Sequence, residues 1–246
     1  MGNPHILLWF EAPLQSWGAD SLFGRRDTLA FPTKSGVLGL LCSALGAGGP
    51  QRVFLAEFAA LNQTVVSFAR GRASHDGVGK LDREPLLRDF HMVGGGYDNQ
   101  DPWANLLIPK TSSGGKPTKS GNALYGGTIR TYRYYLQDAA FAVVVEVPRD
   151  HVNAMTRSLQ NPDWDIYLGR KTCVPTDFVY RGTFDTEKSA LIAAQAIAQG
   201  KGRTEDFRVL TGASDEEETF TLHDVPVQFG EDKRYRDRQV TVIYAR

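Results

Sequence analysis

The sequence predicts an α+β fold, a sandwich of the ferredoxin-like kind with a long inserted loop and a smaller β-rich C-terminal part. Three observations support this fold class. Short apolar or alternating runs, typical of strands, are interspersed with patterns of helical spacing. Glycine accounts for 25 of 246 residues, which favours turns and argues against a helical bundle. The hydrophobic share of 41% and the charged share of 23% are typical of globular chains.

The first 160 residues contain the elements that suggest this fold. Residues Ile6–Phe10 form a compact apolar run followed by Pro13, which indicates a buried strand. Residues 35–45 place apolar side chains at helical spacing, with Ser35 as the expected N-cap and Gly46 beyond the end. Neighbouring strands with helices between them favour a ferredoxin-like sandwich. The remaining expected elements are helices at 53–61 and 152–159, the latter capped by Asp150, and strands at 64–69, 86–93, 128–136 and 141–147.

We expect two parts in the chain. The first domain spans residues 1–160 and carries an insert at about 94–128, which is rich in glycine and has little periodicity. Loops of this length are usually functional or disordered. The smaller C-terminal part, residues 161–246, is expected to pack on the first domain. It contains an alanine-rich helical pattern at 187–199 and strand patterns at 207–211, 218–222 and 239–244.

Composition excludes several classes of protein. The 28 basic residues balance the 28 acidic ones, so the chain is no basic nucleic-acid coat, although a local basic patch is compatible with it. Cys42 and Cys173 cannot form a disulfide framework or a four-thiolate zinc site, and the simplest compartment is the cytoplasm. No apolar run approaches the ~18 residues of a membrane span, so we expect no membrane partner.

Catalytic motifs are absent from the sequence. The five histidines form no pair at metal-ligand spacing and lie near no cysteine at such spacing. No serine lies in a Gly-x-Ser-x-Gly elbow, and no P-loop pattern occurs. We therefore predict no catalytic residues, no metal and no cofactor.

One basic region stands out. Residues 102–137 contain no carboxylate, so positive charge is concentrated there. One interpretation is a flexible basic loop without a partner. The other is a finger that follows a phosphate backbone and offers tyrosine faces for base stacking. Its basic residues are Lys110, Lys116, Lys119, Arg130 and Arg133, and its candidate stacking residues include Tyr125 and Tyr132.

A second cluster lies at the start of the first expected helix. Lys34, the Ser35 hydroxyl and Gly36 stand where free N–H groups and the helix dipole favour an anion. A simple capped core helix is the alternative. Further candidates are the cations Arg25, Arg26, Arg170 and Lys171, and Trp17, which either stacks on a base or braces the first loop.

Five motifs in register carry a resemblance to a known family. The chain resembles the CasD-type subunits of the type I-E CRISPR surveillance complex, Cascade. This resemblance implies an RRM-like fold with a long protruding thumb, and the insert at 94–128 lies where that thumb is expected. The motifs are Ala12-Pro-Leu-Gln-Ser-Trp-Gly, Phe31-Pro-Thr-Lys-Ser-Gly-Val-Leu-Gly-Leu-Leu, Asp89-Phe-His-Met-Val, Tyr134-Tyr-Leu-Gln-Asp-Ala-Ala-Phe and Tyr167-Leu-Gly-Arg-Lys-Thr-Cys.

The resemblance also implies a function. It suggests a noncatalytic subunit that binds the 5′ handle of the guide RNA and helps assemble the backbone for antiviral DNA targeting. The implied partners are guide RNA, the backbone subunits, the large subunit and, through the assembled complex, target DNA. Lys34, Ser35 and Gly36 would hold handle phosphates with Arg25 and Arg26 nearby. The residues expected to line the RNA path are Arg130, Arg133, Arg170 and Lys171, and the insert would add Lys110, Lys116 and Lys119.

Two rival functions remain. In the related type I-C branch, the equivalent subunit cleaves precursor guide RNA without a metal, by general acid–base chemistry. His91 together with Lys34 or Tyr134 is the candidate constellation for that reaction. A cytosolic metabolic enzyme is the third class, but no catalytic constellation supports it.

Overall fold

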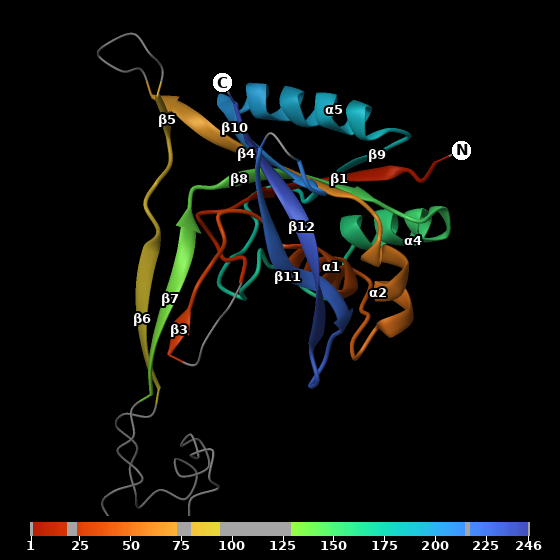
Figure 1. The fold of residues 1–246 in the computed structure, drawn as a ribbon, viewed down its shortest axis with the longest axis horizontal. Coiled ribbons are helices and arrows are strands. Elements are labelled where there is room, and N and C mark those ends of the chain that lie inside the picture. The colour runs from red at the N-terminus through yellow and green to blue at the C-terminus, as the bar shows by residue number, and fades with distance from the viewer. Residues whose placement is uncertain (1, 19–23, 73–79, 94–128, 215–216, 246) are drawn as a thin grey trace, which may run out of the picture.

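Two β-sheets form the framework of the protein (Figure 1). The structure is a computed structural model that describes all residues except 1, 19–23, 73–79, 94–128, 215–216 and 246. The larger, fully antiparallel sheet has the strand order β11-β12-β10-β4-β8-β1-β9, and β5 pairs with β4. Its strands are β1 (His5–Glu11), β4 (Gln63–Arg72), β5 (Lys80–Asp82), β8 (Ala140–Glu146), β9 (Tyr180–Phe184), β10 (Arg203–Thr211), β11 (Glu218–Gln228) and β12 (Arg234–Tyr244).

The smaller sheet is built around one long strand, β7 (Ile129–Gln137). It pairs antiparallel with β2 (Leu14–Gln15) and β6 (Leu87–Val93) and parallel with β3 (Arg25–Arg26). Strands β6 and β7 project together from the body of the protein, and we call this pair the arm (Figure 1). The insert at 94–128 connects the two strands of the arm and lies outside the described residues.

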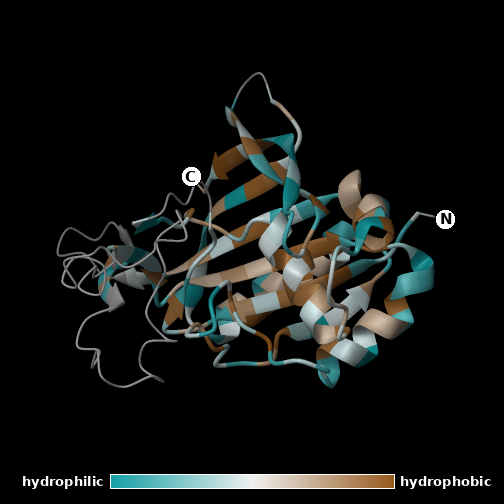
Figure 2. Ribbon diagram, turned by 90° about the horizontal axis from the view of Figure 1, so that it is seen from below, coloured by the Kyte–Doolittle hydropathy of each residue, from teal (hydrophilic) through white to brown (hydrophobic). Residues whose placement is uncertain are grey.

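Helices cover both faces of the larger sheet (Figure 1). The helices α1 (Lys34–Ala44), α2 (Arg52–Ala59) and α4 (Arg149–Gln160) pack into one hydrophobic core, whereas α5 (Glu187–Gly200) packs into the other. Strand β1 supplies both cores, because successive strand residues point to opposite faces. Its side chains Ile6, Leu8 and Phe10 lie in the first core, and Leu7 and Trp9 lie in the second. This two-sided burial explains why the strand is an uninterrupted apolar run, and Figure 2 shows the hydrophobic residues gathered in the central strands.

Two predicted helix caps are wrong. Helix α1 begins two residues earlier than an N-cap at Ser35 implies, with Thr33 as its N-cap. Thr33 has the extended backbone of an N-cap residue, and its Oγ1 accepts the N–H of Gly36 at 3.1 Å, so Ser35 lies inside the helix. Helix α4 has Pro148 at the N-cap position, and Asp150 lies in its first turn.

The C-terminal strands extend the main sheet. Strand β10 pairs with β4, and β12 then pairs with β10, so residues before and after 160 share one sheet. The expected boundary at residue 160 therefore does not separate two sheets. The mixed α+β character is as predicted. None of the described helices is long and apolar enough to cross a bilayer. Cys42 and Cys173 are both free and buried.

Candidate functional site

Lys34, which the sequence predicted as a phosphate contact, does not present its ammonium group at the surface. Lys34 is only 3% exposed, and its Nζ donates to the carbonyl oxygens of Ala59 at 2.9 Å and Leu61 at 2.7 Å. These carbonyls lie at the end of α2, where helix carbonyls lack partners and the dipole favours a cation. Lys34 therefore caps the C-terminal end of α2, and the expectation that it holds a handle phosphate is wrong.

The start of α1 already holds a carboxylate from the same chain. The backbone N–H of Lys34 donates to Oδ2 of Asp224 in β11 at 2.7 Å. Asp224 is also held by Arg238 of β12, through Nε at 2.7 Å and a terminal nitrogen at 2.9 Å. Both side chains are 7% exposed. The position at which the sequence predicted a bound anion is thus filled by Asp224.

Burial lowers the pKa of Lys34. Removal from water is the main reason that the pKa of Lys34 falls to about 8, and the nearby Arg238 guanidinium acts in the same direction. The Asp224 carboxylate opposes this decrease in the pKa. Lys34, Asp224 and Arg238 therefore form a buried charged group that joins α1 to β11 and β12.

A large hollow opens beside the first turn of α1. It has a volume of about 670 Å³, and we call it the α1 hollow. Ser35 and Gly36, two of the predicted RNA-binding residues, line it. None of the described residues that line it is acidic, whereas Arg26, Lys233 and His223 contribute basic groups. The other lining residues are Ser16, Trp17, Gly18, Thr33, Gly169, Phe229 and Tyr235. A carboxylate-free hollow with cationic walls suits a polyanion.

Trp17 braces the loop on which it lies. It is 1% exposed, and its ring stacks on Phe10 at a centroid distance of 5.3 Å. Its Nε1 donates to Oε1 of Gln15 at 3.1 Å. A Cβ at Gly36 would lie only 2.9 Å from Trp17 Cε3, so the helix start packs directly on the ring. Trp17 has no free face for a base, and the stacking interpretation is wrong.

The predicted arginines have different roles. Arg25 and Arg26 are both exposed on β3, and the Arg25 guanidinium lies 5.0 Å from the ring centroid of Tyr134. Arg170 is half-buried, and a terminal nitrogen donates to the backbone oxygen of Arg26 at 2.9 Å. Its guanidinium also lies 4.7 Å from the ring centroid of Tyr135. Arg170 therefore holds β3 beside β7. Arg25 pairs with the Asp27 carboxylate at 2.8 Å, so the exposed charge of β3 comes mainly from Arg26.

The structure describes only some of the remaining residues that were predicted to bind RNA. Lys171 is exposed, and Arg133 is half-buried in β7. Arg130 lies in β7, but its side chain is not described. Four further predicted RNA-binding residues lie outside the described residues: Lys110, Lys116, Lys119 and Tyr125.

Two residues of the arm were missed by the sequence analysis. Phe90 is 47% exposed and lies 5.4 Å from the ring of Tyr132, which is 40% exposed. The Arg88 guanidinium lies 5.5 Å from the Tyr132 ring centroid. Arg88 and Phe90 lie two residues apart, which is the strand spacing that places side chains on one face. The arm thus presents an exposed aromatic pair beside a cation, a surface on which bases can stack.

The residues of the rival catalytic constellation are not brought together. Strand register pairs His91 with Thr131 and Arg88 with Tyr134. His91 and Arg88 are three residues apart, so His91 and Tyr134 lie on opposite faces of the arm. His91 Nε2 contacts the Asp89 carboxylate, and Lys34 is engaged at α2. The described residues also contain no cluster of three or more potential metal ligands.

A family model and a relative of known description match this chain. The family model for CRISPR-associated protein (Cas_Cas5) matches residues 5–242. The chain is 30% identical over 185 residues to the CRISPR system Cascade subunit CasD of Escherichia coli (strain K12), covering 73% of this chain and 70% of that protein.

Solved structures show the same relationship. A chain from a CRISPR RNA-guided surveillance complex matches with a TM-score of 0.65 and 28% identity, over 98% of this chain and 89% of that chain. A Cas protein crystal structure matches with a TM-score of 0.57 and 28% identity, over 98% and 94%. The resemblance drawn from the sequence motifs is confirmed. The chain therefore belongs to the CRISPR-associated protein (Cas_Cas5) family.

Proposed function

We propose that the protein is a noncatalytic subunit of a type I-E Cascade complex and binds the 5′ handle of the guide RNA. The observation that carries the proposal is the α1 hollow, whose described lining residues include cations and no carboxylate. It lies in a chain that is similar to a Cascade subunit over 73% of its length. An RNA backbone is the polyanion that such a subunit would meet.

The topology supports the finer description of the fold as ferredoxin-like, or RRM-like. Four strands of the larger sheet lie in the order β4-β8-β1-β9. Helices α1 and α2 follow β1, β8 follows β4 across the arm, and α4 precedes β9. This is the βαββαβ connection pattern, with β10, β11 and β12 added at the β4 edge. In this proposal the arm and the insert at 94–128 form the thumb.

We assign the RNA contacts to the exposed groups. Arg26 and Lys233 would neutralise handle phosphates at the α1 hollow, beside Ser35 and Gly36 in the first turn of α1. Tyr132 and Phe90 would stack on bases along the arm. Further phosphate contacts would come from Arg25, Arg133, Lys171, Lys110, Lys116, Lys119 and Arg130.

The proposed partners follow from the same role. The arm projects from the body and is the natural contact for a backbone subunit, because it is the part of the described chain that extends furthest from the core (Figure 1). The large subunit and target DNA would be met through the assembled complex in the cytoplasm. No cofactor is proposed.

Binding of labelled handle RNA tests the proposal directly. Fluorescence anisotropy of a 5′-handle RNA should show weaker binding by Lys233→Glu than by the parent. The salt slope should decrease by about 0.7 for each phosphate that the variant no longer neutralises. Lys188→Glu is the matched control, because Lys188 is an exposed lysine on α5, which packs on the opposite face of the sheet from α1. Equal binding by Lys233→Glu and the parent contradicts the assignment of the α1 hollow.

Incubation with repeat RNA in EDTA separates binding from cleavage. We expect the repeat RNA to remain intact on a denaturing gel, because His91, Lys34 and Tyr134 are not assembled into one site. Cleavage at a single position under these conditions would favour the rival function of a metal-independent processing endoribonuclease.

A further inference from the structure

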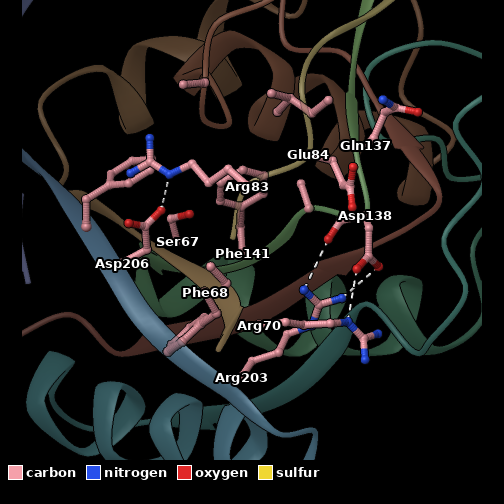
Figure 3. A pocket seen from close by; sticks show the side chains of 15 residues that line it. Ser67, Phe68, Arg70, Arg83, Glu84, Gln137, Asp138, Phe141, Arg203 and Asp206 are labelled. Carbon is pink, nitrogen blue, oxygen red and sulfur yellow. Dashed lines mark hydrogen bonds and ion pairs between the residues drawn. The ribbon is translucent and has the colours of Figure 1, made fainter. Parts of the chain in front are cut away.

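Two short connections join the arm to the main sheet. Residues 83–86 lead from β5 to β6, and residues 138–139 lead from β7 to β8. In each connection one charged side chain pairs with a residue of β10 (Figure 3). The side-chain amide of Gln137, at the end of β7, also donates to the backbone oxygen of Pro85 at 2.8 Å, which ties the two connections together. We call this set of contacts the root of the arm.

The second connection turns at a left-handed residue that two arginines hold. Asp138 has a φ of 44°, which is uncommon for a residue with a side chain, although aspartate tolerates it better than most. Its carboxylate pairs with Arg203 of β10 at 2.9 Å and with Arg70 of β4 at 3.0 Å (Figure 3). Its backbone oxygen accepts a further bond from Arg203 at 3.1 Å. Two strands of the main sheet therefore fix the corner at which β7 leaves the body of the protein.

The first connection is held at a bulge in β10. The register between β10 and β4 shifts between Glu205 and Phe207, so Asp206 is the extra residue of the bulge. A bulge changes the direction in which a strand side chain points. The Asp206 carboxylate is contacted by Nε of Arg83 (Figure 3), and the Arg83 guanidinium also lies 4.9 Å from the ring centroid of Phe207. Two consecutive residues of β10 thus hold one arginine of the connection.

The two ion pairs have opposite polarity. The first connection supplies the cation Arg83 to Asp206 of β10, whereas the second supplies the carboxylate of Asp138 to Arg203 of β10. A displaced arm that moved Arg83 towards Arg203, or Asp138 towards Asp206, would bring like charges together. The pattern of charge therefore favours a single placement of the arm.

Stability alone does not account for these pairs. The Arg203 side chain is 1% exposed and that of Asp206 is 8% exposed, so charge has been removed from water at both places. Apolar side chains of similar volume often stabilise a fold as well as such pairs do, and the best-attested use of a buried polar group is to fix register. Within the described residues β6 pairs only with β7, so no strand of the main sheet sets its direction.

We propose that the ion pairs of Arg83 and Arg203 lock the arm at one angle to the main sheet. Both arginines are then positioning residues for Phe90 and Tyr132, the exposed aromatic pair of the arm, and neither contacts RNA itself. The lock keeps this pair at a constant distance from the α1 hollow, so an RNA strand that meets both does not have to order the arm when it binds. The consequence for RNA rests on the proposed function, whereas the lock itself does not.

Double electron–electron resonance on the full-length protein measures the lock without RNA. Nitroxide labels at Asp89→Cys on the arm and Ala196→Cys on the exposed face of α5 report the distance from the arm to the main sheet. Cys42 and Cys173 are buried and should remain unlabelled. We expect one narrow distance distribution for the parent.

Two variants weaken the lock without leaving a buried charge unpaired on β10. Arg83→Met combined with Asp206→Leu replaces the first pair by apolar side chains, so the melting temperature should change little. Asp138→Asn removes the charge of the second connection but keeps a side chain that tolerates the left-handed backbone. Both should lose the narrow distribution, and Arg83→Lys, which keeps the charge opposite Asp206, should retain it.

The matched control removes an ion pair of the same strand on its other side. Arg208 contacts Glu205 within β10, and Glu205 also contacts Gln195 of α5, away from the arm. Arg208→Met combined with Glu205→Leu should therefore keep the narrow distribution. A narrow distribution in both lock variants overturns the proposal, and so does a broad one in the parent or in the control.

Anisotropy with handle RNA then tests the consequence for binding. The two lock variants should bind up to about tenfold more weakly than the parent, which is the effect of losing one stacked base. A broadened arm with unchanged RNA affinity would uphold the lock and overturn its role in RNA binding. A parent that binds no handle RNA but shows the narrow distribution would reject the proposed function and uphold the lock.

Discussion

Replacing Lys34 with methionine tests whether this lysine serves the fold or the RNA. Methionine keeps an unbranched apolar stem but removes the Nζ, which donates to Ala59 O and Leu61 O at 2.9 and 2.7 Å. Each carbonyl left without a partner in a partly buried position costs about 1 kcal/mol, so the free energy of unfolding should fall by about 2 kcal/mol at pH 7. For a chain of this length the melting temperature should fall by roughly 4–8 °C.

The pH dependence of this loss gives a second signature. The pKa of Lys34 is about 8 in the folded protein, below its ordinary value of 10.5. Between these values the unfolded chain binds a proton that the folded chain does not, so stability from this group increases with pH. The difference between the parent and Lys34→Met should therefore increase by about 3 kcal/mol between pH 8 and pH 10.5.

Urea denaturation at several pH values measures both effects. Lys188→Met is the control, because Lys188 is exposed and its loss should leave the urea midpoint unchanged. RNA binding is measured without urea at a temperature at which both variants are folded, and Lys34→Met should then bind like the parent. An unchanged urea midpoint together with weaker RNA binding would refute the structural role of Lys34.

Three further substitutions test other parts of the structure. Trp17→Ala should lower the free energy of unfolding by about 3–5 kcal/mol, as a large core truncation does, with the loss visible in a melting curve recorded without RNA. Arg238→Ala should destabilise the protein by about 3 kcal/mol because it leaves the buried Asp224 carboxylate without its partner, and unchanged urea denaturation would argue against this pair. Tyr132→Ala should leave the melting temperature unchanged and weaken handle RNA binding about tenfold, through the loss of one stacked base. Normal RNA affinity in Tyr132→Ala would remove the arm from the proposed RNA path.

Local sequence patterns were sufficient to predict most of the helices and strands. The apolar run of β1, the helical spacing of α1 and the alternation of β7 each depend on neighbouring residues, and each element formed within a few residues of its expected bounds. The short strands β2, β3, β5 and β9 were missed, because strands of two or three residues and the mixed composition of β9 carry no periodicity. The family was also visible in the sequence, because its motifs occur in order along the chain.

The candidate site depended much more on tertiary structure. Ser35 and Gly36, which the sequence analysis proposed as binding residues, line the α1 hollow, but Lys233 and His223 reach that hollow from the far end of the chain. No periodicity relates residues so far apart, so their charge could not be assigned to this place in advance.

The sequence by itself determined most of the α+β elements and the family. Only the tertiary structure decided the roles of Lys34 and Trp17, because both depend on which surfaces come to cover them. The carboxylate of Asp224 reaches the backbone N–H of Lys34 across 190 residues of sequence. In the sequence, the start of α1 has free N–H groups that could bind an anion. In the folded protein, β11 supplies the carboxylate that accepts one of these N–H groups, and the position of β11 is fixed only when the main sheet has assembled. Local sequence patterns do not contain such long-range pairing.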